Sequence, residues 1–301
     1  AVLALLHTRG DPDALQPGEE LVLFGSREGR IEIGGGLSLP IRPLSVILPE
    51  DVAGAGIIHL AYLTKDKLDA LGEPAFDAGN EAIDAALLSA LGEARAAGVF
   101  VASSGAARLA ETGQDRHPYG LAKLRQEARF LDFGRTSGVS VLCGRIFNLA
   151  GPHINKLEAY AVSNFALQAL DRRAIRISAK RPTFRSFLHV TDLARLVLRS
   201  LRQGHAEARP IDLCGNEILE MEDIAQRVAQ QIGADVAVLR DHVSFDERSD
   251  YVGVPQDTRT LAMRLSVRLA DMQMQISDTI KWIEGAHEIG TQQRVLTRAG
   301  Q

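Results

Sequence analysis

The sequence contains few of the residues that would place a protein in a specialised structural class. Only two of its 301 residues are cysteine, Cys143 and Cys214, and both stand in apolar runs that resemble strands. Two cysteines without clustered histidines give no metal-ligand spacing, so we expect no metal site. Two buried free thiols in a reducing compartment are the simpler interpretation. A soluble cytoplasmic protein is therefore expected.

An excess of one charge and a long hydrophobic run are also missing. The 34 basic and 38 acidic residues give a net charge of −4, so there is no basic excess to hold nucleic acid. No apolar run approaches the roughly 20 residues that are needed to cross a bilayer. The N-terminal stretch AVLALLHTRGDPD lacks the basic lead-in and cleavage site of a signal peptide. Neither nucleic acid nor a membrane is expected as a partner.

The residues that are present predict a layered α/β fold. With 46% hydrophobic residues the chain can form one large domain or two smaller ones. Its predicted strands are nearly all apolar, as in parallel strands that are covered on both faces. They are LVLFGSR (21–27), GIIHLAY (56–62), GVFVASS (98–104), VSVLCGRIFN (139–148), FLHV (187–190) and IDLCG (211–215). Helical periodicity, ending on glycine, marks the segments 78–98, 119–138, 191–204 and 221–233.

The alternation of strands and helices predicts a doubly wound, Rossmann-like parallel sheet, and the more mixed composition of the C-terminal part suggests a smaller lobe. We expect residues 1–151 and 186–216 to form the core with the sheet, and residues 152–185 and 217–301 to form the lobe. In such sheets ligands bind outside the carboxyl ends of the strands. Polar residues follow the predicted strands at those ends, at Ser103-Ser104, Asn148 and Asp192.

The stretch HPYGLAK, residues 117–123, places a tyrosine and a lysine four positions apart. On a helix Tyr119 and Lys123 would share a face near the N-terminus. A phenol has a pKa of about 10, but a nearby ammonium and the positive helix end favour the phenolate. Ser104 is placed to hold the same substrate oxygen. We predict that these three residues transfer the proton of an alcohol while hydride leaves or reaches its carbon. The alternative is an ordinary amphipathic pair.

The motifs, in this order, resemble those of the extended short-chain dehydrogenase/reductase superfamily. More closely, they resemble the NAD(P)-dependent nucleotide-sugar epimerase/dehydratase family. The resemblance covers roughly residues 56 to 232. The segments that carry it are IIHLAY (57–62), AGNEAI (78–83), VASSGAA (101–107), YGLAK (119–123), GRIFNLAGP (144–152), RSFLHVTDLA (185–194) and IDLCGNEILEMEDIA (211–225).

This resemblance implies that the core binds a dinucleotide and that the C-terminal lobe is a substrate-binding lobe. It also implies roles for residues outside the predicted triad. The dinucleotide is implied to lie against Leu60, Ala61, Tyr62, Asn80, Ser103 and Phe147, as well as Tyr119 and Lys123. Asn148 is implied to meet the sugar nucleotide, and Arg185 to bind its diphosphate, a role that suits a guanidinium. A solvated surface arginine is the alternative for Arg185. Ser104 and His153 are further candidates for substrate contact, and a surface position is the alternative for His153.

The glycine-rich turn of that family, G-x-x-G-x-x-G, is not found in the sequence. Gly34 to Gly36 do not replace it, because no helical pattern follows them, and we expect an ordinary turn there. Either the family's turn precedes Ala1 or ordinary dinucleotide binding has been lost. The start of the chain inside an apolar run favours the first alternative.

The end of the second predicted strand bears on the choice of cofactor. NAD-binding proteins usually place an acid there for the ribose hydroxyls. Here the sequence is LFGSREGR, and Ser26, Arg27 and Arg30 would suit a 2′-phosphate. The cofactor is expected to be NAD(P), with a preference for NADP. A polar turn without a ligand is the alternative.

The expected activity is that of an NAD(P)-dependent nucleotide-sugar epimerase. Dehydratases of the family carry an Asp-Glu pair after the active hydroxyl residue, where this chain has Gly105 and Ala106, so dehydration is not expected. One alternative is an NADPH-dependent ketone or aldehyde reductase with the same triad. Another is a binding or regulatory protein that has this fold without turnover. By resemblance, segments 78–98 and 119–138 would form the core of a homodimer.

Overall fold

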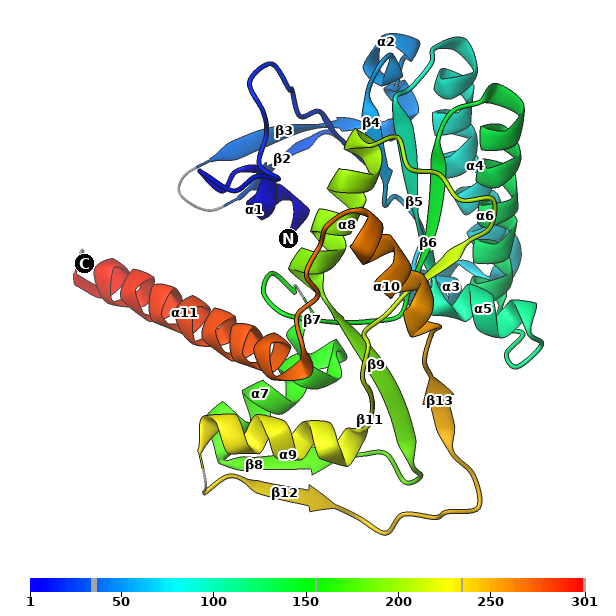
Figure 1. The fold of residues 1–301 in the computed structure, drawn as a ribbon. Helices are drawn as coiled ribbons and strands as arrows, with labels where there is room; N and C mark the ends of the chain where they lie inside the picture. Colours follow the sequence, from blue (N-terminus) through cyan, green and yellow to red (C-terminus); the bar gives the residue numbers. More distant parts are fainter. Residues whose placement is uncertain (34–36, 155, 234, 300–301) are drawn as a thin grey trace. The chain divides into compact units, whose positions relative to one another are not determined.

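The computed structural model describes residues 1–33, 37–154, 156–233 and 235–299 (Figure 1). They group into two compact units, each of which we describe by itself. The parallel-sheet unit contains residues Val2–Ile146 and Arg195–Asp212. The second unit contains Ala1, Phe147–Ala194 and Leu213–Gln301. Gly34 to Gly36, which we expect to form a turn, lie outside the described residues.

A four-stranded sheet forms the centre of the parallel-sheet unit. Its order is β10 (Ile211–Leu213), β6 (Val141–Ile146), β5 (Gly98–Ser104) and β4 (Gly56–His59). β5 pairs in parallel with β4 on one side and with β6 on the other. β5 and β6 are buried along most of their length, as a sheet covered on both faces requires. The predicted α/β fold with a Rossmann-like parallel sheet is confirmed.

Helices cover both faces of this sheet (Figure 1). Helices α4 (Glu73–Glu93) and α6 (Pro118–Ser137) lie on one side, and the part of α8 (Val190–Arg202) that belongs to this unit lies on the other. The core beneath α4 and α6 is formed by buried aliphatic and aromatic side chains, including Leu87, Leu91, Val99, Phe130 and Val141. The shorter helices are α1 (Val2–Leu6), α2 (Pro49–Val52), α3 (Lys65–Leu71), α5 (Gly105–Glu111) and η1 (Leu44–Val46).

A separate three-stranded sheet comes from the N-terminal part of the same unit. Its order is β1 (Leu23–Gly25), β3 (Ser38–Pro43), β2 (Gly29–Glu32). β1 pairs with β3 in parallel, and β2 pairs with β3 antiparallel. The strand predicted at 21–27 therefore exists as β1, but among the described residues its pairing partner is β3 and not a strand of the four-stranded sheet.

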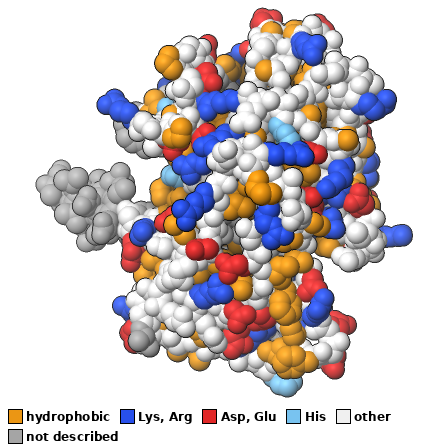
Figure 2. Space-filling view, in the orientation of Figure 1, with side chains coloured by type: hydrophobic (Ala, Val, Ile, Leu, Met, Phe, Trp, Pro, Cys, Tyr) orange, Lys and Arg blue, Asp and Glu red, His pale blue; other side chains and the backbone are white. Residues whose placement is uncertain are grey.

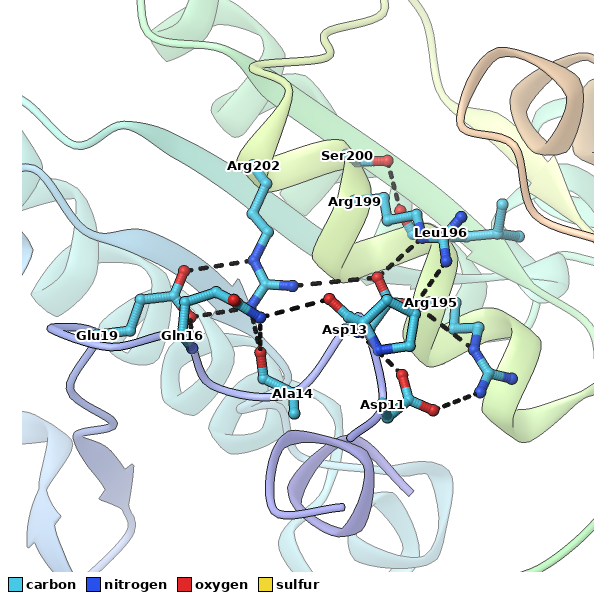
Figure 3. Close-up of polar contacts among 11 residues, drawn as sticks. Asp11, Asp13, Ala14, Gln16, Glu19, Arg195, Leu196, Arg199, Ser200 and Arg202 are labelled. Atoms are coloured by element: carbon cyan, nitrogen blue, oxygen red, sulfur yellow. Dashed lines mark hydrogen bonds and ion pairs between the residues drawn. The ribbon is translucent and has the colours of Figure 1, made fainter. Parts of the chain in front are cut away.

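Ion pairs attach residues 11–19 to α8 (Figure 3). Asp13 is only 2% exposed and accepts hydrogen bonds from Nε and Nη2 of Arg199, each at 2.8 Å. Two further pairs of the same kind flank it, Asp11 with Arg195 and Glu19 with Arg202, each at 2.8 Å. Since the arginines recur along one face of α8, this N-terminal segment is held along the helix by charge.

The second unit is built around β9 (Thr183–His189). Strands β7 (Asn148–Ala150) and β13 (Ser249–Tyr251) pair with it in parallel, and β11 (Ile218–Glu220) pairs antiparallel. A second small sheet joins β8 (Ala174–Ile177) to β12 (Ala237–Arg240). The helices are α7 (Ala161–Arg172), α9 (Met221–Ile232), α10 (Pro255–Arg264), α11 (Met272–Ala299) and η2 (Leu157–Ala159). Residues 187–189 of the segment FLHV are buried and pair in parallel with β7, as predicted for a buried parallel strand, but they lie in this mixed sheet and not in the four-stranded sheet.

Other features of the described residues agree with the sequence. Cys143 and Cys214 are buried free thiols, as predicted. No described helix combines the length and hydropathy of a membrane span. On the face drawn in Figure 2, basic and acidic side chains are interspersed, which is consistent with a nearly balanced charge.

Candidate active site

Ser104 ends β5 and begins α5. Its backbone is extended, with φ of −140° and ψ of 149°, and its Oγ accepts a hydrogen bond from the Ala106 amide at 3.2 Å. A serine is favoured at this position because its hydroxyl can satisfy an amide of the first helical turn. The cap fixes the Ser104 side chain at the carboxyl end of a central parallel strand, the edge at which ligands bind in such sheets.

Tyr119 lies in the first turn of α6. The helix starts with Pro118, whose fixed φ suits that position, and His117 caps it by accepting the Tyr119 amide at 3.2 Å. Gly120 makes the next step possible, because a Cβ on it would lie 2.6 Å from the carbonyl oxygen of Ala106. The glycine therefore lets the first turn of α6 approach the first turn of α5. This close approach brings the segment that carries Tyr119 to the segment that Ser104 caps.

Lys123 follows one turn later and is almost completely buried, with 4% of its surface exposed. Its Nζ donates to the carbonyl oxygen of Ala102 at 2.8 Å and to Oε1 of Gln126 at 2.9 Å. Burial disfavours the charged form and lowers the pKa of Lys123 to about 7, although nearby carboxylates such as Asp84 oppose that change. Lys123, whose ammonium is predicted to assist Tyr119, therefore gains or loses its charge near neutral pH.

The ring of Tyr62 covers this ammonium. Lys123 Nζ lies 3.5 Å from the centroid of that ring, within the range of a cation–π contact. The same ring meets Tyr119 edge-on, with centroids 6.2 Å apart, and Phe76 edge-on at 6.5 Å. Burial raises the pKa of Tyr62. The family resemblance implies only that Tyr62 lines the dinucleotide, and the sequence does not predict its ring packing with both Tyr119 and Lys123.

A buried carboxylate stands behind Lys123. Asp84, on α4, is fully buried and accepts hydrogen bonds from Gln126 at 2.7 Å, His59 at 3.1 Å and Arg129 at 2.6 Å. Burial alone would raise the pKa of Asp84, but these hydrogen bonds outweigh burial and hold it below its ordinary value. The sequence alone does not single out Asp84. Its only signal was a single acid in the otherwise apolar stretch EAIDAALL (81–88).

Ser103 points away from Ser104, into a second buried cluster. Its hydroxyl donates to a carboxylate oxygen of Glu127, and the same carboxylate receives Arg145 Nε at 2.9 Å and Nη2 at 2.7 Å. Arg145 also pairs with Glu111 at 2.6 Å. Glu127 and Arg145 are 2% and 3% exposed. The Ser103 hydroxyl thus joins β5 to α6.

The loop after β4 contributes the remaining predicted residues of this unit. Leu60 is 60% exposed, and Ala61 is half-buried. Asn80, on α4, is 1% exposed, and its Oδ1 accepts the Leu63 amide at 2.7 Å, which fixes the end of the loop. Asn80 Nδ2 is buried and has no hydrogen-bond partner among the residues that the structure describes.

The residues proposed for a 2′-phosphate are divided between two elements. Ser26 and Arg27 are exposed directly after β1. Arg30 lies within β2, where it donates from Nε to Oγ of Ser38 and from Nη2 to its carbonyl oxygen, both at 2.9 Å. Arg30 therefore has a structural partner across the β2–β3 pair, whereas Ser26 and Arg27 lie at the end of the strand as the sequence predicts.

Four predicted residues belong to the second unit, and three of them converge there. Asn148 Nδ2 donates to the carbonyl oxygens of Ser186 at 3.2 Å and Tyr251 at 3.3 Å. The guanidinium carbon of Arg185 lies 5.9 Å from the ring centroid of Tyr251, and the ring of Phe147 lies 5.0 Å from the same ring. Tyr251 was not predicted, because strand β13 carries no motif that singled it out.

His153 lies apart from that group. Its ring packs against Trp282 at 4.2 Å between centroids, and its backbone has a positive φ of 65°. Burial lowers the pKa of His153. A neutral imidazole held against an indole is thus the local structure at this position.

The parallel-sheet unit offers features that a bound polar ligand would complete. Asn80 Nδ2 and Tyr62 Oη are both buried, and neither has a hydrogen-bond partner among the described residues. Buried polar atoms in native proteins are nearly always satisfied, by protein, water or ligand. The Asn80 amide and the buried ammonium of Lys123 are hydrogen-bond donors that fit the hydroxyl oxygens of a dinucleotide.

A parallel α/β sheet in which Ser104 ends a central strand and Lys123 bonds to that strand, with Tyr119 one turn before the lysine on α6, resembles the arrangement of a short-chain dehydrogenase/reductase. The model of the NAD-dependent epimerase/dehydratase family matches residues 46–213. The chain belongs to that family, which confirms the resemblance seen in its motifs and makes it a member of an enzyme family.

Solved structures with the same fold cover most of the chain. An NAD-dependent NDP-hexosamine 5,6-dehydratase of tunicamycin biosynthesis is similar over 89% of this chain and 90% of that chain, with a TM-score of 0.69 and 18% identity. The UDP-N-acetylglucosamine 4-epimerase of Bacillus cereus is similar over 88% of each chain, with a TM-score of 0.63 and 18% identity. At these identities the likeness shows the fold alone.

Two curated relatives are similar in sequence over shorter stretches. UDP-glucuronic acid decarboxylase 6 of Arabidopsis thaliana is 31% identical over 123 residues, which are 41% of this chain and 35% of the plant protein. GDP-6-deoxy-D-mannose reductase of Pseudomonas aeruginosa is 27% identical over 132 residues, which are 42% of each. The match thus spans about a third of the plant relative and under half of the bacterial one.

Proposed function

We propose that this chain is an NAD(P)-dependent epimerase that acts on a nucleotide sugar. The observation that carries the proposal is the local geometry of the parallel-sheet unit. Ser104 ends a central strand, Gly120 lets the turn that carries Tyr119 approach it, and Lys123 holds a buried ammonium one turn later. This set combines a hydroxyl donor, a phenol and a charge that favours its ionisation.

In the proposed reaction Tyr119 takes the proton of a sugar hydroxyl, while Ser104 hydrogen-bonds to the same oxygen. NAD(P), when bound, supplies a reversible hydride acceptor. Loss of the hydroxyl proton and of the hydride from its carbon converts the alcohol to a ketone. The hydride then returns to the opposite face of that carbon, and the proton returns to its oxygen. The product is the epimer, with no net oxidation or reduction. Lys123, when charged, stabilises the phenolate of Tyr119 and would bond the ribose of the dinucleotide.

For the cofactor, we propose that Leu60, Ala61, Tyr62, Asn80, Ser103 and Phe147 line the dinucleotide. The buried, unpartnered Nδ2 of Asn80 supports the part of this proposal that concerns α4. A preference for NADP is supported by the exposure of Ser26 and Arg27 after β1, since a hydroxyl and a guanidinium suit a phosphate ester. Arg30 would have to release Ser38 to take part.

For the substrate, we propose that Asn148 and Arg185 bind the nucleotide diphosphate and that His153 contributes a further contact. Tyr251 is added to this set, because it packs between Phe147 and the guanidinium of Arg185. An aromatic face beside a guanidinium suits a ligand that carries both a base and phosphate groups. A homodimer through α4 and α6 is part of the proposal, supported by small exposed residues on α4 such as Ala78, Ala82 and Ala85.

Two further activities have a specific observation in their favour. The similarity to plant UDP-glucuronic acid decarboxylases favours the same oxidation on a uronic acid, where the β-keto acid that forms would lose CO₂. The similarity to GDP-6-deoxy-D-mannose reductase favours a net reduction of a ketone. Both use a proton carrier such as Tyr119, so the site residues alone do not separate them from epimerisation.

The test is to incubate the full chain with NAD or NADP and either UDP-glucose or UDP-glucuronic acid, and to follow the sugar by proton NMR. An epimerase interconverts two sugars with no net change in nicotinamide absorbance. A decarboxylase releases CO₂ from the uronic acid, and a reductase consumes NADPH in proportion to product. Failure to bind either dinucleotide, measured by calorimetry, would overturn all three and leave a binding or regulatory protein.

A further inference from the structure

The ammonium of Lys123 is surrounded on every side by groups of the protein. An ammonium has three donors. Two of them are used by Ala102 O at 2.8 Å and Gln126 Oε1 at 2.9 Å, and the face of the Tyr62 ring covers the group at 3.5 Å from its centroid. A ligand oxygen that is to reach Lys123 Nζ must therefore replace one of these three contacts.

Two of the three contacts are fixed from the interior. The Ala102 carbonyl belongs to β5, and the Gln126 amide is oriented by Asp84, which accepts from its Nε2 at 2.7 Å. Because a carboxylate only accepts hydrogen bonds from such an amide, Gln126 has to present its oxygen to Lys123. Gln126 and Asp84 are 1% and 0% exposed, so neither group can turn away without leaving a buried polar atom unpaired.

The third contact is of a different kind. Tyr62 lies in the loop between β4 and α3, beside Leu60, which is 60% exposed. Its hydroxyl is buried and has no hydrogen-bond partner among the described residues. When the ring covers Lys123, Tyr62 gains a cation–π contact, but its hydroxyl has no hydrogen-bond partner. When the ring turns toward solvent, Tyr62 loses that contact, and water can bond to its hydroxyl. The two effects are comparable in size, so the covering position is one that a ligand can displace.

We propose that Tyr62 is a positioning residue that covers Lys123 in the ligand-free protein and is displaced when a ribose diol of the dinucleotide binds to the ammonium. The inference rests on the proposed function, because it takes NAD(P) as the ligand. Displacement of the ring uses part of the binding free energy, so the covered state weakens dinucleotide affinity. Tyr62 therefore sets the dinucleotide affinity and keeps Lys123 shielded from solvent until the cofactor arrives.

The test compares the affinity of the full chain for NADP, measured by calorimetry, among three proteins. Tyr62→Ala removes the ring and should tighten binding at least about 2-fold, the factor for covered and open states of similar free energy, and at most about 30-fold, the factor for an unopposed cation–π contact. Tyr62→Phe keeps the ring without its unsatisfied hydroxyl, which favours the covered state, so binding should be weaker than in the wild-type protein. In a Lys123→Met background Tyr62→Ala should give no gain, because there is no ammonium to uncover. Tyr160→Ala, in the second unit, is the matched control.

A second readout follows the ring directly. The chain has four tyrosines, so fluorotyrosine labelling gives few fluorine NMR signals, and Tyr62→Phe assigns the one of interest. Without ligand this signal should be insensitive to exchange of H₂O for D₂O, and it should become sensitive on addition of NADP. Circular dichroism confirms that each variant is folded.

The outcomes separate the two proposals. If the wild-type protein binds NADP but Tyr62→Ala binds no more tightly, or the Tyr62 signal does not respond to NADP, the cover is overturned and the proposed function stands. If neither the wild-type protein nor Tyr62→Ala binds a dinucleotide, the proposed function fails and the displacement fails with it. If Tyr62→Ala binds NADP and the wild-type protein does not, the result supports both the proposed function and the displacement of the ring.

Discussion

The side-chain amide of Gln126 connects Asp84 to the catalytic centre that we propose, over 42 residues of sequence. Its nitrogen donates to Asp84 at 2.7 Å, and its oxygen accepts from Lys123 at 2.9 Å. This relationship ties α4 to α6 through a buried polar chain. It leaves Lys123 with a defined position but no carboxylate in direct contact among the described residues, which is why burial dominates its pKa.

Replacement of Gln126 by leucine should therefore affect both stability and activity. Leucine has similar bulk but cannot pair with Asp84 or Lys123. Because both groups keep other partners, we take the loss of the two bonds together to cost about 1–3 kcal/mol. We expect the free energy of unfolding, measured with urea, to fall by about that amount. Turnover should also fall, because Lys123 loses one of the bonds that position it. Gln203→Leu, at an exposed glutamine, is the control and should change neither quantity.

Replacement of Tyr119 by phenylalanine tests the proton carrier. The ring and its packing against Tyr62 remain, but the group that accepts the substrate proton is lost. We expect turnover to fall by about 10²- to 10⁴-fold, the usual contribution of general acid–base catalysis, with little change in dinucleotide affinity. Tyr160→Phe serves as the control. Unchanged turnover in Tyr119→Phe, measured with the same nucleotide sugar, would remove Tyr119 from the mechanism.

The lowered pKa of Lys123 makes stability depend on pH in a defined window. Its pKa is about 7 in the folded chain and 10.5 for a fully solvated lysine side chain, so between these values the unfolded chain binds the additional proton. Above pH 10.5 the Lys123 amine is neutral in both the folded and the unfolded chain, so its burial costs no stability. As the pH falls toward 7 the unfolded chain is stabilised by the additional proton, and the stability of the folded chain is lost. The free energy of unfolding of the wild-type protein, relative to Lys123→Met, should rise between pH 7 and 10.5 by up to about 1.4 kcal/mol per pH unit.

Urea denaturation of the wild-type protein and of Lys123→Met at several pH values measures the difference between their free energies of unfolding. The contributions of all other titrating groups are common to the two proteins and cancel in this difference. A constant difference across the window would mean that Lys123 stays charged in the folded chain. A difference that decreases as the pH rises would give the opposite sign and would show that a partner charge, not burial, controls the residue.

Much of the fold could be predicted because it depends on local patterns. The apolar run GVFVASS became β5 with its predicted bounds, and YGLAK lies on a helix that begins one residue earlier than expected, at Pro118. Strand burial and helix capping act within a few residues of the chain, so one sequence is enough to find them. The same holds for Ser104, which both ends a strand and caps a helix.

The contacts that distinguish this site could not be predicted, because they depend on which segments meet. Asp84 and Gln126 are ordinary polar residues until α4 and α6 pack together. The ring of Tyr62 reaches Lys123 only through the course of the loop after β4. FLHV has the composition of a buried parallel strand, and its residues 187–189 do pair in parallel with β7. Composition does not identify β7 as that partner, nor the antiparallel β11 that pairs with residues 184–186 of the same strand.

The ion pairs between residues 11–19 and α8 predict a measurable contribution to stability (Figure 3). Asp13 is 2% exposed and pairs with Arg199, so Asp13→Asn removes the carboxylate charge that accepts from Arg199 Nε and Nη2. We expect the free energy of unfolding to fall by about 3 kcal/mol, the lower end for breaking a buried pair, because Arg199 is partly exposed. Glu28→Gln, at an exposed acid, is the control. An equal effect of the two substitutions would show that only net charge matters.

The contact of Gly120 with Ala106 can be tested with a matched pair of glycines. A Cβ on Gly120 would lie 2.6 Å from Ala106 O, and neither backbone can yield without separating α5 from α6. Gly120→Ala should therefore lower stability by about 1–3 kcal/mol, as overpacking does. It should also reduce turnover more than dinucleotide affinity, because it moves Tyr119 away from Ser104.

Gly92, in α4, has nothing within 4 Å of a built Cβ. Gly92→Ala should leave activity unchanged and stabilise the chain by up to about 1 kcal/mol, through helix propensity alone. If Gly120→Ala behaved like Gly92→Ala in both measurements, the close approach of the two helices would not be what aligns serine and tyrosine.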